Sequence, residues 1–68
     1  MELEEFMQLL KEKKLSEVKN SLLEMNEFDI ASLIEELPED KIVQAFRLLP
    51  KNMATDVLLI WMTKFKKS

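Results

Sequence analysis

The chain has no cysteine, histidine or glycine among its 68 residues. Without cysteine there is no disulfide framework and no thiolate chemistry. Without histidine the chain lacks the commonest general base and the commonest ligand of transition metals. An active site also needs a pocket and groups in perturbed environments, for which this composition offers little, so we expect no enzymatic activity.

The same scarcity limits the fold class. Sheet proteins need glycine-type turns and β-branched runs, and this sequence has neither, with only two prolines to break its direction. Hydrophobic residues make up 47% of the chain, which favours a folded core over disorder. A chain of this length has room for one domain. We therefore predict a single all-α domain over residues 1–68.

Charge and hydropathy exclude further classes of protein. The net charge of −3 disfavours nucleic acid as a partner, because phosphate binding needs a concentrated basic surface. The longest apolar run, residues 57–62, is far shorter than the roughly 20 residues of a membrane-spanning helix. No signal-peptide core follows the acidic first residues. We expect a cytoplasmic protein with no direct membrane insertion.

The apolar residues recur at helical spacing in five segments separated by short breaks. This pattern predicts about five short antiparallel helices, the first over about residues 2–13 and the last over about 51–66. Ser16 and Asn26 are predicted N-caps, and Pro38 and Pro50 are predicted to separate the third, fourth and fifth helices. Residues 29–32 and 52–55 share a pattern that is either coincidence or an internal repeat, and a repeat would make the array superhelical.

The fifth segment is apolar around most of its circumference, so five short helices cannot bury it on every side. We predict that it contacts another protein, either a second copy or a continuation of the array. The alternative is that its aromatic residues fold back into the core. The predicted interface residues are Val57, Leu58, Ile60, Trp61 and Phe65.

Residues 28–58 read FDIASLIEELPEDKIVQAFRLLPKNMATDVL. This run resembles the signature of MgtE-type magnesium transporter N-terminal domains: D-[IL]-A-x-L-[LI]-E-x-L-P-x-[ED], then R-L-L-P, then A-x-[ED]-V-L. The likeness extends over about residues 6–58. The chain departs from the pattern at Asn26-Glu27, where the family usually has His-Pro, and after Leu58, where further family helices are missing. We therefore expect the first half of the family domain, truncated relative to the whole.

The resemblance implies a cytosolic regulatory domain that packs against a CBS domain pair when Mg²⁺ is abundant. Acidic side chains of both domains share the ions and so gate transport. One acidic position of the family pattern corresponds to Asp56, which the resemblance makes the candidate metal ligand. The alternative is that Asp56 is an exposed residue at the polar edge of its helix. No cofactor is expected for the isolated chain; Mg²⁺ enters in the full-length context only.

Other charged residues have plainer expectations. The densest acidic cluster, around Pro38, is predicted to be a solvated helix end followed by favourable charges on the next helix; its members are Glu35, Glu36, Glu39 and Asp40. Arg47 either pairs with a nearby acidic residue, meets a partner or is solvated. More distantly, the array resembles modules of the flagellar switch protein FliG and the motor chaperone MotE. These modules bind other proteins, so the alternative function is a self-associating structural or adaptor module with no metal role.

Overall fold

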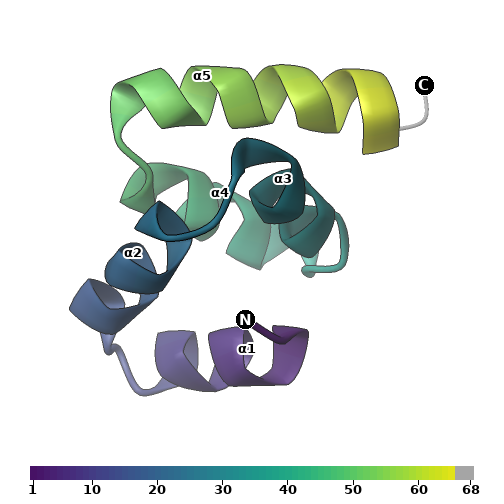
Figure 1. Ribbon diagram of the computed structural model, residues 1–68. Coiled ribbons are helices and arrows are strands. Elements are labelled where there is room, and N and C mark those ends of the chain that lie inside the picture. Colours follow the sequence, from purple (N-terminus) through teal and green to yellow (C-terminus); the bar gives the residue numbers. More distant parts are fainter. Residues whose placement is uncertain (66–68) are drawn as a thin grey trace.

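The computed structural model describes residues 1–65 of the chain. That part forms five α-helices and a terminal π-helical turn, with no strand (Figure 1). The elements are α1 (Leu3–Lys11), α2 (Leu15–Leu23), α3 (Glu27–Glu35), α4 (Glu39–Leu48), α5 (Lys51–Ile60) and the π-helical turn η1 (Trp61–Phe65). The predicted all-α fold is confirmed. The superhelical arrangement and the internal repeat stay predictions.

The first helix ends in a left-handed turn at Lys13, whose φ is 59°. The backbone N–H of Lys14 donates to the carbonyl of Leu9 at 2.9 Å, and the N–H of Lys13 donates to the carbonyl of Leu10 at 3.1 Å. This pair of bonds is the Schellman motif, in which glycine usually holds the left-handed position. In this glycine-free chain a lysine holds it instead.

Of the two predicted N-caps, Asn26 is confirmed and Ser16 is wrong. Asn26 caps α3: its side-chain oxygen accepts from the N–H of Asp29 at 2.8 Å, and its amide nitrogen donates to the Asp29 carboxylate at 3.0 Å. Ser16 is not a cap, because α2 already begins at Leu15 with Lys14 at the N-cap position. Because the Schellman motif ends at Lys14, α2 begins at the next residue and Ser16 already lies within its first turn.

The two prolines separate helices as predicted, and each occupies the N-cap position directly before a helix. Pro38 precedes α4 and Pro50 precedes α5, both with extended ψ angles of 153° and 151°. The Pro38 carbonyl accepts the first bond of α4, from the N–H of Ile42 at 3.2 Å. Proline suits this place because its missing N–H has no partner to lose there.

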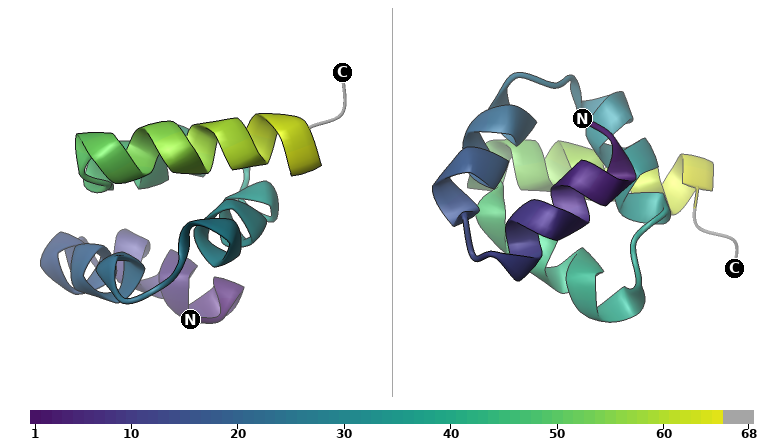
Figure 2. Two further views of the ribbon diagram at one scale, coloured as in Figure 1. Left: turned by 45° about the horizontal axis from the view of Figure 1, so that its top comes forward. Right: turned by 90° about the horizontal axis from the view of Figure 1, so that it is seen from below.

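The described residues share one hydrophobic core, in which α3 lies between the other helices (Figure 2). Helix α3 packs most extensively against α5 and η1, which follow it only after the whole of α4. Helices α1 and α5 lie on opposite sides of the molecule in both Figure 1 and Figure 2. The fully inaccessible core side chains are Phe6, Val18, Ile30, Ala31, Ile34, Ala45 and Val57.

The fifth helix is α-helical only to Ile60 and continues as η1 to Phe65; the predicted end near Lys66 lies outside the described residues. The Thr63 hydroxyl donates to the carbonyl of Leu59 at 2.7 Å, within the junction between the two helical forms. A hydroxyl that bonds back to the preceding turn competes with the backbone ladder there.

Candidate docking surface on α5

The inner side of α5 and η1 is held by the chain itself. Val57 has no exposed surface, so it is a core residue and leaves the predicted interface. The Trp61 indole N–H donates to a carboxylate oxygen of Glu35 at 2.9 Å, and its ring meets the ring of Phe46 edge-on at 6.0 Å between centroids. This arrangement joins η1 to the ends of α3 and α4.

The last aromatic residue also folds back. The ring of Phe65 lies 5.2 Å from that of Phe28 at the start of α3, at a tilt of 55°. Ile60, Trp61 and Phe65 are half-buried and pack against the core. The alternative in which the aromatic residues return to the core therefore describes this side of the helix better than an exposed interface does.

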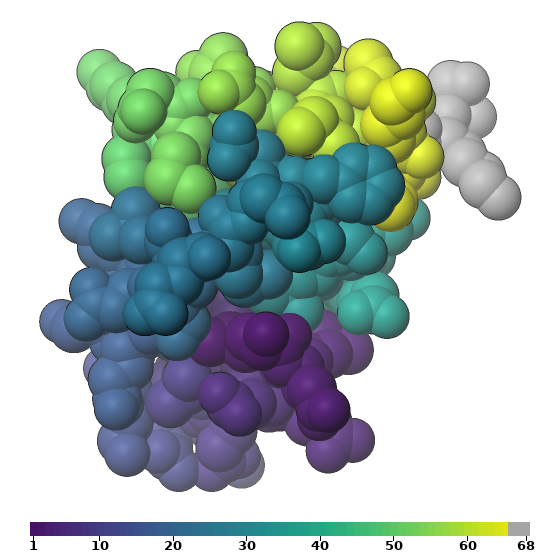
Figure 3. Space-filling view, viewed as in Figure 1, coloured from purple at the N-terminus to yellow at the C-terminus, as the bar shows by residue number. Residues whose placement is uncertain are grey.

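The outer side of α5 and η1 carries three exposed large apolar side chains beside exposed polar ones. In Figure 3 the spheres of this segment form the upper border of the molecule. Leu58, Leu59 and Met62 are 42%, 62% and 54% exposed, and we call these three residues the α5 outer patch. Of the predicted interface residues, only Leu58 belongs to it. Leu59 and Met62 were missed, although helical geometry places Leu59 about 200° around the helix from the buried Val57.

Asp56 lies on the same exposed side of α5, three residues before Leu59. Residues 1–65 contain no group of three acidic residues close enough together to hold a metal ion. Mg²⁺ often takes one or two carboxylates and keeps several waters. Asp56 is exposed, and the described residues form no such group around it.

The acidic residues around Pro38 are all exposed but do not act as one cluster. Glu35 accepts the bond from Trp61, whereas Asp40 lies 3.9 Å from the Lys41 ammonium. Glu39 and Asp40 stand in the first turn of α4, where the helix dipole favours negative charge. Arg47 is exposed on α4.

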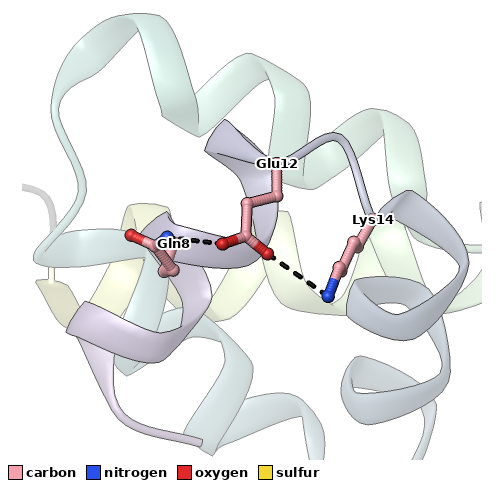
Figure 4. A network of polar contacts seen from close by, with 3 residues as sticks. All are labelled: Gln8, Glu12 and Lys14. Atoms are coloured by element: carbon pink, nitrogen blue, oxygen red, sulfur yellow. Dashed lines mark hydrogen bonds and ion pairs between the residues drawn. The ribbon is translucent and has the colours of Figure 1, made fainter.

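Three polar side chains form a network at the C-terminal end of α1 (Figure 4). The Gln8 side-chain amide donates to one carboxylate oxygen of Glu12 at 2.6 Å, and the Lys14 ammonium lies 3.3 Å from the other oxygen. The hydrogen bond from Gln8, followed by the hydrogen bond and charge of Lys14, lowers the pKa of Glu12 below its ordinary 4.5. The network brackets the left-handed turn at Lys13.

Comparison with known proteins adds no assignment: no family model matches the chain, and neither curated proteins nor solved structures give a match. Within the described residues, every helix is too short or too polar to traverse a bilayer.

Proposed function

We propose that the chain is a docking domain of MgtE type, which acts on the cytosolic side of a magnesium transporter and binds a CBS-type partner domain across shared Mg²⁺ ions. The observation that carries the proposal is the exposed carboxylate of Asp56 beside the α5 outer patch. The run of residues 28–58 supports the same reading, because its A-x-[ED]-V-L element ends on this surface.

The proposed mechanism follows from charge. Two acidic surfaces repel when they approach, with about 1 kcal/mol for a pair of unit charges 4 Å apart in water and more where water is excluded. A Mg²⁺ ion between Asp56 and a partner carboxylate replaces that repulsion with two favourable contacts. When the Mg²⁺ concentration falls, the carboxylates repel again and the domain is released, which gates transport.

The apolar residues supply the binding energy that the ion then controls. Burial of apolar surface contributes about 25 cal/mol per Å², so covering Leu59 and Met62 yields on the order of 1–2 kcal/mol each. Such a contribution is smaller than the cost of about 4–15 kcal/mol for the translational and rotational freedom that two molecules lose on association, so it does not hold the domains together without the metal. Docking is therefore expected to be conditional on Mg²⁺.

The test measures binding of the chain to the CBS domain pair of an MgtE-type transporter from the same organism by isothermal titration calorimetry. We expect binding in millimolar Mg²⁺, loss of binding in EDTA, and about tenfold weaker binding for Asp56→Asn. Glu17→Gln on the exposed side of α2 is the matched control and should bind like the wild type. Binding that is equal in EDTA, or that Asp56→Asn leaves unchanged, would contradict the proposal.

The alternative function is self-association as a structural or adaptor module of the FliG and MotE kind, and the three contiguous exposed side chains of the α5 outer patch favour it. Sedimentation equilibrium without metal then shows a homo-oligomer that Leu59→Glu dissociates. Leu23→Glu is the control, because Leu23 is a similarly exposed leucine (45%) on α2. A monomer at millimolar concentration of the chain would exclude this alternative.

A further inference from the structure

A second surface lies where the end of α1 and the turn after it meet α4; α1 itself lies on the opposite side of the molecule from α5 (Figure 2). There a groove of about 550 Å³ runs between the end of α1, the turn after it, and α4. Leu10, Leu15 and Leu48 contribute its apolar lining. This volume is in the range of sites that enclose a drug-sized ligand or a few side chains of a partner.

The charged residues of this groove all have the same sign. They are Lys11, Lys13, Lys41 and Arg47, and no acidic residue lines the groove. Four of the ten lysines and arginines of a net negative chain therefore gather in one place. Lys41 has only a loose pair with Asp40 at 3.9 Å, and the other three form no ion pair within residues 1–65. The lining of the groove is thus entirely cationic in charge, and Glu4 lines an adjoining hollow together with Lys11 and Lys41.

The spacing of the charges indicates the kind of ligand. Lys41 and Arg47 are six residues apart on α4, which is about 9 Å along the helix axis. Lys11 and Lys13 add charges on the opposite wall. Cations spread along two walls fit several separated carboxylates better than a single phosphate, whose donors converge on one point.

The apolar lining narrows the choice further. A leucine floor rewards burial of apolar side chains, which a nucleic acid backbone does not offer. Single-stranded nucleic acid also stacks its bases on aromatic rings, and no aromatic residue lines this groove. An amphipathic helix that places leucine-like residues on one side and carboxylates along its flanks satisfies both features. We propose that this groove binds an acidic amphipathic helix of a partner protein, independently of Mg²⁺.

The probe is a fluorescein-labelled helical peptide of about four turns, with Leu at every third or fourth position and Glu elsewhere. A second peptide with the same Leu positions and Lys in place of Glu is the control. We expect the Glu peptide to bind with micromolar affinity, to shift NMR signals of residues 10–15 and 41–48, and to bind at least tenfold more weakly as salt rises from about 50 to 500 mM. The Lys peptide should not bind.

The matched variants separate the groove from overall charge. The double variant Lys11→Glu/Arg47→Glu should weaken binding of the Glu peptide by at least tenfold. Lys19→Glu/Lys51→Glu changes the net charge equally at exposed positions outside the groove and should weaken it less than threefold. Circular dichroism checks that both variants remain helical.

Several outcomes would overturn the inference. They are no binding of the Glu peptide at millimolar concentration, equal binding of the Lys peptide, signal shifts confined to α5, and equal losses in the two double variants. Vesicles containing phosphatidylserine form a separate arm: capture by vesicles without binding of the Glu peptide would assign the groove to a membrane surface instead. Because every arm is run in EDTA, failure here is distinguishable from failure of the proposed Mg²⁺-dependent docking on α5.

Discussion

At the scale of single residues, Lys13 stands out as the one residue of the described chain with a positive φ. A left-handed conformation costs about 1–2 kcal/mol for a residue with a Cβ atom, whereas glycine adopts it freely. The two Schellman bonds at Lys13 and Lys14 hold the turn in place and fix where α2 starts. The Lys13 side chain also contributes a positive charge to the groove between α1 and α4.

Replacing Lys13 with glycine should therefore stabilise the protein. We expect Lys13→Gly to raise the free energy of unfolding by about 1 kcal/mol, because the relief of strain exceeds the added entropy of the unfolded chain. Urea denaturation measures the change. Lys19→Gly, inside α2, is the control and should lower stability by about 1 kcal/mol. A loss of stability in Lys13→Gly would contradict the strain argument.

The carboxylate of Glu12 should titrate below its ordinary pKa of 4.5. Because the folded pKa is depressed, the associated stabilisation is present above pH 4.5 and is lost as the pH falls through the folded pKa. NMR titration of the Glu12 side chain measures this directly. Gln8→Ala should raise the pKa by removing the largest single contribution, and Lys14→Met should raise it by removing a hydrogen bond and a positive charge. An unchanged pKa in Gln8→Ala would show that the bond in Figure 4 does not persist in solution.

At the scale of helices, the sequence identified elements and breaks better than it identified helix starts. Asn26 was recognisable as a cap because Asp29, three residues later, can complete the reciprocal pair. Ser16 is followed at the same distance by Lys19, which cannot. The actual start of α2 depends on a left-handed lysine, and no glycine or asparagine in the sequence marked that turn.

The two predicted caps should differ sharply when they are replaced by alanine. Asn26→Ala should lower the free energy of unfolding by about 1 kcal/mol, because the N–H of Asp29 loses its acceptor. Ser16→Ala should change it by less than about 0.5 kcal/mol, because Ser16 makes no capping bond in α2. Thermal melting followed by circular dichroism compares the pair, and equal losses would restore Ser16 as a cap.

At the scale of the whole molecule, periodicity named the core residues of α3 but not the surface that they meet. Ile30, Leu33 and Ile34 were predicted as one apolar stripe and are all buried. These residues belong to α3, whose main neighbour is α5, although α4 separates the two helices in the sequence. The pairing of α3 with α5 depends on how whole helices fit together, which the local spacing of apolar residues does not encode. This pairing determines that Val57 is buried while Leu59 is exposed. The groove combines residues of α1 and α4 for the same reason.

Truncating a core side chain should lower stability far more than truncating a side chain of the α5 outer patch. Ile34→Ala removes a fully buried side chain and should cost about 3 kcal/mol, a large part of the stability of so small a domain. Leu59→Ala removes a side chain that is 62% exposed and should cost less than about 0.5 kcal/mol. Urea titration of the two variants tests the packing, and a large loss for Leu59→Ala would mean that α5 is rotated from its described orientation.

Trp61, which donates a hydrogen bond to Glu35, gives the protein an intrinsic fluorescence probe. Trp61 is the only tryptophan of the chain, and it lies where η1 meets α3 and α4. Its fluorescence therefore reads the docking of the final helix, while circular dichroism reads all helices together. The two signals should melt at one temperature if the domain unfolds as a single unit. An earlier fluorescence transition would reveal that this last segment detaches before the remainder unfolds.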